Sequence, residues 1–232
     1  MQKTIVITGA GQGIGRAAAL HLAAQGWHVH VVGRTLSKLN DVAAQIEQVG
    51  GSVAAAALDV TDEAAVMRFA AGLGDAPLDA LVNCAGEALI KPFAQTTTDD
   101  WMRLLTINLM GPALMSRALL PNLLRSDNAS IVNIGSTTTA RGVGGVSAYT
   151  AAKTGLLGLT RSLAAELREQ KVRVVMLSPG PTDTPMRWAA TPDFDRALVI
   201  DAQPVAEALA WLLSLPQGVT TSEFLLQSVN IL

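Results

Sequence analysis

The sequence is poor in cysteine, tyrosine and charged residues, and each scarcity narrows what the chain can be. Its single cysteine, Cys84, excludes an internal disulfide and suits a reducing compartment, so we expect a cytoplasmic protein. Charged residues make up 16% of the 232 positions, and 17 basic against 19 acidic side chains leave a formal net charge of −2. Because no basic run offsets this balance, we expect no binding to nucleic acid. Half of the residues are apolar, which excludes a disordered chain.

Long apolar runs and metal-binding patterns are also missing. A membrane-spanning helix needs about 20 consecutive apolar residues, and no such run occurs, so we expect no membrane contact. The opening segment MQKTIVITGA holds only a short apolar run, which indicates a buried strand rather than a secretory signal. His21, His28 and His30 do not have the spacing of a metal-binding motif, so we expect no metal site.

Short apolar segments alternate with longer amphipathic ones along the whole chain. Seven segments predict strands: Lys3–Thr8, Trp27–Val32, Ser52–Leu58, Leu78–Val82, Ala129–Ile134, Val172–Leu177 and Glu223–Val229. Six segments predict helices: Ile14–Gln25, Ser37–Val49, Glu63–Leu73, Asp99–Arg125, Ser147–Gln170 and Val205–Leu215. Near-continuous apolar strands alternating with helices are typical of a parallel sheet covered on both faces. We therefore predict an α/β fold, a doubly wound parallel seven-stranded sheet with helices on both faces, in a single domain spanning residues 1–232.

Residues that start and stop helices support these boundaries. Gly26 follows the first predicted helix and Pro216 follows the last. Asp62 and Thr98 are the predicted N-caps of the helices that follow them. The segment Pro179–Pro204, rich in Pro, Thr and Asp, is the only long stretch without a predicted element, and such stretches are often lids or binding loops.

A glycine-rich turn, Thr8–Gly15, follows the first strand and opens the first helix. Glycines let a phosphate approach the backbone, and a helix N-terminus presents free N–H groups with partial positive charge. The spacing fits T-G-x-x-x-G-x-G, whereas G-x-G-x-x-G fails because Ile14 and Arg16 stand where its third glycine belongs. Since no lysine completes a triphosphate-binding loop, the turn predicts a dinucleotide site rather than a nucleotide triphosphatase.

The end of the second strand indicates which dinucleotide is bound. Dinucleotide-binding folds usually carry an Asp or Glu there to hold the ribose hydroxyls. No acidic residue occurs between Trp27 and Asn40, and Arg34 stands in that place. A guanidinium suits a phosphate, so we predict NADP(H) as the cofactor, with NAD(H) the less favoured alternative. Gln12 occupies the turn position where a second basic residue would strengthen this prediction.

Tyr149, the only tyrosine, precedes Lys153 by four residues, which places both side chains on one face of a helix. A free tyrosine has a pKa of about 10, and a nearby ammonium lowers that pKa by favouring the phenolate. Tyr149 can then exchange the proton that moves when a carbonyl becomes an alcohol. Ser136 follows the fifth predicted strand at its carboxyl end, where open α/β sheets bind ligands, and its hydroxyl can bind the same carbonyl oxygen.

Pro112 lies inside the predicted helix Asp99–Arg125. Because proline has no N–H, the carbonyl of Asn108 loses its helical partner, and we predict a kink at this point. A carbonyl freed in this way can hold a water molecule near the site.

In their order along the chain, these motifs resemble the short-chain dehydrogenase/reductase family, and the likeness covers essentially all 232 residues. The family's T-G-x-x-x-G-x-G turn matches Thr8–Gly15, and its N-N-A-G motif appears as Asn83–Gly86. The resemblance implies a Rossmann fold and the catalytic residues Asn108, Ser136, Tyr149 and Lys153. With the turn and the strand end, it implies these cofactor contacts: Gly9, Gln12, Gly13, Ile14, Gly15, Arg34, Thr35, Asp59, Val60, Asn83, Ala85, Gly86, Tyr149, Lys153, Pro179, Gly180, Thr182 and Thr184.

The resemblance also implies a proton relay from Tyr149 through the cofactor ribose and Lys153 to a water on Asn108. Three features depart from the family pattern. Cys84 replaces the second Asn, Gly135 precedes Ser136 where a serine is common, and residues 218–232 lack the usual Gly-Gly ending. We therefore expect the end of the chain to contribute differently to the substrate pocket and to subunit contacts.

These features predict an NADP(H)-dependent oxidoreductase, a carbonyl reductase in class. It would transfer a hydride between nicotinamide and a ketone, aldehyde or secondary alcohol. Three alternatives remain open: a dinucleotide sensor without turnover, an NAD-dependent dehydrogenase of the same fold, and an NAD-dependent epimerase or dehydratase. We expect a homodimer or homotetramer formed through the helices Asp99–Arg125 and Ser147–Gln170.

The residues that select the substrate are expected in three segments: Glu87–Thr98, Thr137–Val146 and Met186–Gln203. Arg141 is a candidate partner for a substrate carboxylate, and Trp188 is a candidate cover for the bound substrate.

Overall fold

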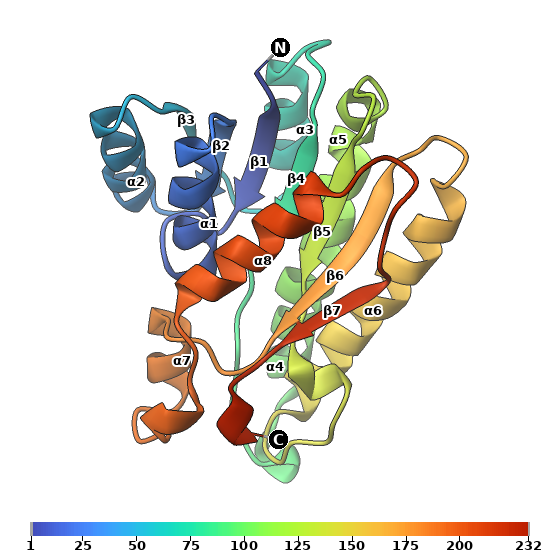
Figure 1. Cartoon of the computed structure of the whole chain (residues 1–232). Helices are drawn as coiled ribbons and strands as arrows, with labels where there is room; N and C mark the ends of the chain where they lie inside the picture. Colours follow the sequence, from blue (N-terminus) through green and yellow to red (C-terminus); the bar gives the residue numbers. More distant parts are fainter. Residues whose placement is uncertain (1, 232) are drawn as a thin grey trace.

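The computed structural model describes residues 2–231 and contains one parallel sheet of seven strands in the order β3-β2-β1-β4-β5-β6-β7 (Figure 1). Every strand pair in the sheet is parallel. The strands are β1 (Thr4–Thr8), β2 (His28–Gly33), β3 (Ser52–Ala57), β4 (Ala80–Asn83), β5 (Ser130–Ile134), β6 (Arg173–Pro179) and β7 (Glu223–Leu226). This arrangement confirms the predicted doubly wound, seven-stranded α/β fold.

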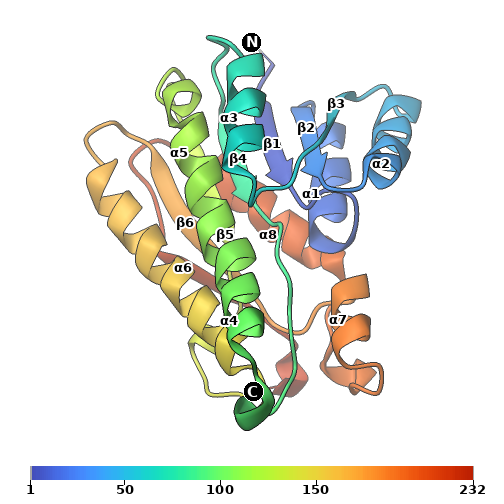
Figure 2. The ribbon, with the colours of Figure 1, turned by 180° about the vertical axis from the view of Figure 1, so that it is seen from behind.

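Helices cover both faces of the sheet, as Figures 1 and 2 show from opposite sides. On one face lie α1 (Gly13–Ala24), α2 (Leu36–Gln48) and α8 (Ala202–Ser214), whose buried side chains share a core with alternate residues of β1 and β2. On the other lie α3 (Glu63–Gly72), α5 (Gly111–Leu123) and α6 (Ser147–Glu166). Alternate residues of one strand thus enter different cores, which is why the strands are almost wholly apolar.

The predicted helix Asp99–Arg125 forms three consecutive segments: α4 (Thr98–Leu105), a π-helical turn η2 (Thr106–Met110) and α5. The distortion predicted at Asn108 takes the form of this π turn, in which the N–H of Gly111 donates to the carbonyl of Thr106. Pro112 explains the distortion, because it has no N–H with which to continue the regular pattern. The segment is long and apolar enough to cross a membrane, but more than half of its most apolar stretch is buried within the molecule.

The N-cap of α4 is Thr97, one residue before the predicted Thr98. The Thr97 hydroxyl accepts a hydrogen bond from the Asp100 N–H at 3.2 Å, and the Asp100 carboxylate accepts one from the Thr97 N–H at 3.1 Å. This reciprocal capping box places the helix start where both partners fit. The other predicted N-cap, Asp62, accepts from the N–H of Ala65 as expected.

The segment Pro179–Pro204 is more ordered than predicted. It contains the short helix α7 (Pro185–Ala190) and the 3-10 turn η4 (Arg196–Leu198), and α8 begins at Ala202 rather than Val205. Thr184 caps α7 by accepting a hydrogen bond from the Arg187 N–H at 3.2 Å. A threonine followed by proline is a known start of a helix. The high content of Pro and Thr in this segment led the sequence analysis to predict no helix there.

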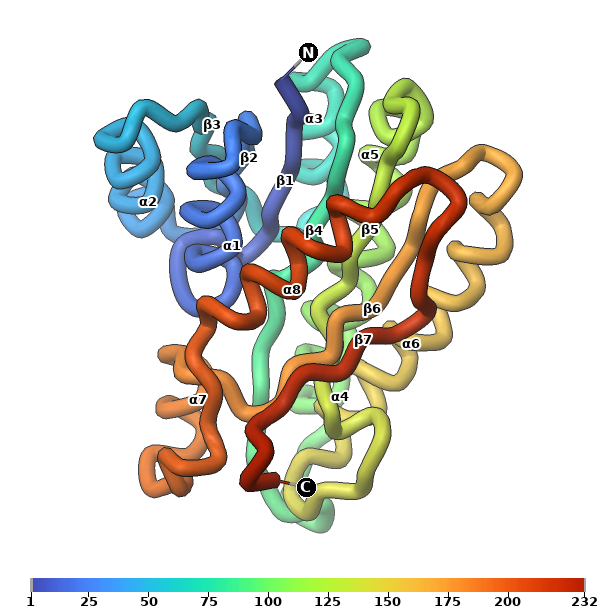
Figure 3. Tube along the Cα trace, viewed as in Figure 1, coloured from blue at the N-terminus to red at the C-terminus, as the bar shows by residue number. Residues whose placement is uncertain are grey.

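The other differences are confined to element ends. The helix α6 ends at Glu166 rather than Gln170, and β7 ends at Leu226, after which Val229–Ile231 forms the 3-10 turn η5. Two further 3-10 turns, η1 (Phe93–Gln95) and η3 (Thr137–Thr139), lie in the loops after β4 and β5. Figure 3 shows α7 and the C-terminal segment at the same end of the molecule, beyond the carboxyl ends of the strands.

Candidate active site

A cleft of about 610 Å³ lies at the carboxyl ends of the strands. The strand order reverses between β1 and β4, and ligands of open α/β sheets bind at such a point. Most residues predicted to bind cofactor or act in catalysis line this one cleft: Gly9, Gln12, Gly13, Ile14, Arg34, Thr35, Asp59, Val60, Ala85, Gly86, Asn108, Ser136, Tyr149, Lys153, Pro179, Gly180, Thr182 and Thr184. Residues from eight separate segments therefore meet where the sequence analysis expects a dinucleotide.

Two of the predicted cofactor contacts do not line the cleft. A Cβ on Gly15 would stand 2.5 Å from the Gly9 carbonyl oxygen, so Gly15 allows the turn to fold closely over α1. Asn83 is buried, and its amide donates to Asn133 Oδ1 at 2.8 Å and to Ser116 Oγ at 3.1 Å. Both residues support the walls of the cleft without lining it, because they pack against or bind other atoms of the protein.

The glycine turn is tied to the loop after β4. Gly9 has φ +68°, and a Cβ there would lie 2.9 Å from the backbone of Ala85. The Thr8 hydroxyl accepts hydrogen bonds from the N–H groups of Cys84 and Ala85, each at 3.0 Å. These contacts hold the turn so that the N-terminus of α1 opens into the cleft, where an anion would be stabilised.

Two cations lie at the end of the cleft beside β2. Arg34 lines it as predicted, and Lys38, which the sequence analysis missed, lines it too. The Lys38 Nζ donates to Gln12 Oε1 at 2.8 Å, so it reaches the glycine turn from the first turn of α2. Its position four residues after Arg34, at a helix start that follows a strand, is the signal that could have revealed it.

Asp59 lines the same cleft and interacts with the charge of Arg34. Burial alone raises the pKa of Asp59, but hydrogen bonds from Thr61 and the charge of Arg34 outweigh this effect and hold the pKa below its ordinary value. The Asp59 Oδ1 accepts from the Thr61 N–H at 2.9 Å and from the Thr61 hydroxyl at 2.7 Å. The carboxylate that lines the cleft here is therefore fixed and charged.

Ser136, Tyr149 and Lys153 approach the cleft from β5 and α6. Ser136 and Lys153 are buried, and Tyr149 is half-buried. The Lys153 Nζ donates to the Ile134 carbonyl at 2.8 Å and lies 5.8 Å from the centre of the Tyr149 ring. Burial lowers the pKa of Lys153 to about 8, so its amine can gain or lose a proton close to neutral pH.

The expected lowering of the Tyr149 pKa by Lys153 is absent among the protein's own groups. Burial raises the pKa of Tyr149, and a hydrogen bond with Ser136 and the charge of Arg187 only partly offset this. Lys153 is not among the groups that shift the pKa of Tyr149, and its amine donates to the Ile134 carbonyl instead. The phenol is consequently held in its protonated form, as a proton donor requires.

Asn108 holds the loop that follows β4. Its Oδ1 accepts from the Glu87 N–H at 3.2 Å, and its Nδ2 donates to the Glu87 carbonyl at 2.9 Å and the Leu104 carbonyl at 3.0 Å. A Cβ on Gly86 would lie 2.7 Å from the Asn108 Oδ1, so this approach requires glycine. Because the side chain is used in these contacts, the backbone carbonyl of Asn108 is the group left for a water.

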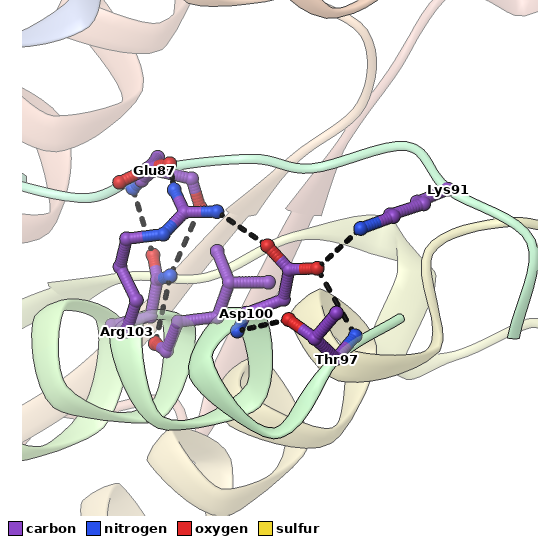
Figure 4. Close-up of polar contacts among 7 residues, drawn as sticks. Glu87, Lys91, Thr97, Asp100 and Arg103 are labelled. Carbon is purple, nitrogen blue, oxygen red and sulfur yellow. Dashed lines mark hydrogen bonds and ion pairs between the residues drawn. The ribbon is translucent and has the colours of Figure 1, made fainter. Parts of the chain in front are cut away.

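Charged side chains reinforce the same loop (Figure 4). The carboxylate of Glu87 pairs with Arg103, whose Nη2 donates to Asp100 Oδ1 at 3.0 Å. The other Asp100 oxygen accepts from Lys91 Nζ at 2.7 Å and from the Thr97 N–H. These contacts lower the pKa of Asp100, with the Lys91 hydrogen bond the largest cause. The loop is thus joined to α4 at both Glu87 and Lys91.

The three segments expected to select substrate all reach the cleft. Their lining residues include Ala88, Ile90, Arg141, Val143, Met186, Arg187 and Phe194. Trp188 does not line the cleft, contrary to its expected covering role. Its Nε1 donates to Asp183 Oδ1 at 2.6 Å, and the Arg196 guanidinium lies 4.3 Å from the centre of its ring, so the indole is held away.

Cys84 also lines the cleft, where burial raises the pKa of its thiol to about 11. A thiol with that pKa is neutral at physiological pH and makes a poor nucleophile. Within residues 2–231, no group of three or more His, Cys, Asp or Glu side chains is arranged to hold a metal ion.

Comparison with known proteins identifies relatives of the whole chain. The family model for short chain dehydrogenases matches residues 3–194. An uncharacterized oxidoreductase of Staphylococcus epidermidis is 31% identical over 230 residues, which cover 98% of each chain.

Solved structures show the same likeness. The closed form of a serine dehydrogenase complexed with NADP+ superposes with a TM-score of 0.90 at 27% identity, covering 98% of this chain and 95% of the other. An alcohol dehydrogenase from the archaeon Thermococcus sibiricus, complexed with 5-hydroxy-NADP, gives a TM-score of 0.90 at 28% identity, covering 99% and 97%. The sequence match, the shared fold and the arrangement of the cleft together show that the chain belongs to the short-chain dehydrogenase family of oxidoreductases.

Proposed function

We propose that the protein is an NADP(H)-dependent oxidoreductase that interconverts a ketone or aldehyde and the corresponding alcohol. The observation that carries this proposal is the meeting of Ser136, Tyr149 and Lys153 with the glycine turn around one cleft. A dinucleotide held by the turn and a carbonyl held by the two hydroxyls would share that space.

The preference for NADP(H) rests on Arg34 and Lys38. Both line the cleft near the end of β2, where a carboxylate would otherwise hold the ribose of NAD. Two cations that line the same cleft suit the additional phosphate of NADP. The serine dehydrogenase and the alcohol dehydrogenase compared above are complexes with NADP+ and 5-hydroxy-NADP, which supports the same preference.

The chemistry divides between cofactor and protein. When bound, the nicotinamide would supply a hydride to the carbonyl carbon or accept one from the alcohol carbon. In the direction of reduction, the Tyr149 hydroxyl gives its proton to the carbonyl oxygen while the Ser136 hydroxyl orients that oxygen by a hydrogen bond. The raised pKa of Tyr149 favours this protonated starting form. Lys153 and Asn108 line the same cleft, and we propose that they return a proton to the phenolate from solvent.

The experiment is an assay of nicotinamide fluorescence with NADPH and NADH in parallel, against a panel of ketones and aldehydes. We expect NADPH fluorescence to fall with at least one carbonyl, and to fall more slowly with NADH. Binding of NADPH without loss of fluorescence on any carbonyl would instead favour a sensor that does not turn over.

We also propose a cytoplasmic homodimer or homotetramer formed through α4, α5 and α6. The single cysteine supports a reducing compartment. Met102 and Met110 support the assembly, since both are about half exposed on the long helix. Replacing both by Glu should shift the mass measured by light scattering toward the monomer.

A further inference from the structure

Arg187 is a half-buried arginine on the substrate side of the cleft. It lies on α7, and local contacts hold it in place. Its backbone N–H donates to the Thr184 hydroxyl at 3.2 Å, and its Nη1 donates to the Thr191 hydroxyl at 3.1 Å. Its guanidinium lies 4.4 Å from the centre of the Phe194 ring. The charge is therefore positioned rather than free to move into solvent.

The guanidinium of Arg187 is incompletely used. Six ion pairs occur among residues 2–231, and none of them includes Arg187. Within the same residues, no group accepts a hydrogen bond from its Nε or Nη2. Arg103, Arg117 and Arg125, by contrast, each contact a carboxylate.

Arg173 shows how the chain treats a buried arginine that has only a structural role. Its guanidinium donates to the carbonyls of Val219, Leu215 and Pro216 and to the Ser130 hydroxyl, all at 2.9–3.0 Å. Burying a charged group without such partners is costly, so an arginine kept half-buried with free donors indicates a ligand that completes them.

An anion bound by Arg187 would lie in the same cleft as the reacting carbonyl. Arg187 and Tyr149 line the same cleft, and the charge of each affects the titration of the other. The nearby walls from Ile90, Val143, Met186 and Phe194 are apolar. A ligand that fills this part of the cleft would have an apolar body with one negative end.

We propose that the substrate is a carbonyl compound, or the corresponding hydroxy compound, that carries a carboxylate, and that Arg187 binds this carboxylate while Ser136 and Tyr149 bind the reacting oxygen. The inference rests on the proposed oxidoreductase function and names its substrate class. It assigns to Arg187 the role that the sequence suggested for Arg141, which lines the cleft but is exposed on a loop. A planar fork of donors pairs with a carboxylate through two parallel hydrogen bonds.

The test compares 2-, 3- and 4-oxo acids with their methyl esters, using NADPH and the variants Arg187→Met and Arg196→Met. Methionine keeps an unbranched apolar stem and removes the charged guanidinium. Arg196 is a matched control because it lies on the same segment and stacks on an aromatic ring, but does not line the cleft. We expect the wild type to favour at least one acid over its ester. Arg187→Met should lower kcat/KM for that acid by about 10- to 100-fold, with little effect on the ester. Arg196→Met should leave both unchanged.

Binding measurements separate the sources of the anion. Calorimetric titration of NADPH into Arg187→Met should give the wild-type affinity, whereas a loss of NADPH affinity would show that Arg187 binds a cofactor phosphate and would overturn the proposal. Equal kcat/KM for acid and ester in the wild type would overturn the carboxylate assignment while leaving the oxidoreductase function intact. Turnover of no carbonyl at all would instead contradict the proposed function. In that case, tighter binding of an oxo acid than of its ester, lost in Arg187→Met, would still support the carboxylate site.

Discussion

The two halves of the cleft are built differently. The cofactor half is formed where buried strands end: β4 and β5 are buried throughout, and β1 is buried except at its first residue. The substrate half is formed by loops and short turns, and neither α7 nor η4 contains a buried residue. The sheet core therefore fixes the cofactor half, whereas local hydrogen bonds and stacking position the substrate half, which is free to change without loss of the fold.

Tyr149 lies between the two halves, and its removal should have the largest effect. The variant Tyr149→Phe keeps the ring and removes the proton donor, so we expect kcat to fall by about 10²- to 10⁴-fold. Affinity for NADPH, measured by calorimetry, should stay close to the wild-type value because the ring remains. Wild-type turnover in this variant would contradict the assignment of the phenol as the acid.

Cofactor choice should depend only on the cofactor half. Replacing Arg34 and Lys38 together by Ala should weaken NADPH binding by about 10- to 100-fold, since two charge-assisted contacts with a phosphate are lost. NADH binding should change little, because NADH lacks that phosphate. A loss of the same size for both cofactors, measured by fluorescence titration, would show that these cations do not read the extra phosphate.

The buried amine of Lys153 should make stability depend on pH. Its folded pKa of about 8 lies below the ordinary value of 10.5, so between these values the unfolded chain binds more protons than the folded one. Stability from this group therefore rises as pH increases through that window, by about 2 kcal/mol between pH 7.5 and 9.5.

Urea unfolding of the wild type and Lys153→Met at both pH values measures this difference. The wild type should gain stability relative to the variant as pH rises. Parallel behaviour of the two proteins would show that Lys153 keeps an ordinary pKa in the folded state.

Substitution of one glycine in each half of the cleft should have the smallest effects, and the two effects should differ. Gly9→Ala, in the cofactor half, should destabilise the fold by about 1 to 3 kcal/mol, because φ is positive and the new Cβ would meet the backbone of Ala85. Gly142→Ala, in the substrate half, should have almost no effect, since nothing lies within 4 Å of the place that a Cβ would occupy. Urea unfolding checks both, and equal losses would mean that the two halves are equally constrained.

Much of the cofactor half could be predicted because its constraints are local. The turn after β1 shows its glycines in consecutive positions, and Tyr149 and Lys153 are related by one helical turn. The alternation of apolar strands with amphipathic helices indicated the parallel sheet for the same reason. Substrate-side residues carry no such local pattern, so only the segments that contain them could be named.

The sequence by itself determined the order of elements and the glycine turn after the first strand, and it pointed to Tyr149 as the proposed acid, because each of these depends on spacing along the chain. Only the tertiary structure decided that Asn83 and Gly15 support the cleft without lining it. It also placed Lys38 with Arg34 in the cleft lining and kept Trp188 out of that lining. The same structure makes the charge of Arg187, rather than that of Lys153, lower the pKa of Tyr149. Burial and charge–charge distances between remote segments control these properties, and such distances exist only once the sheet has brought the segments together.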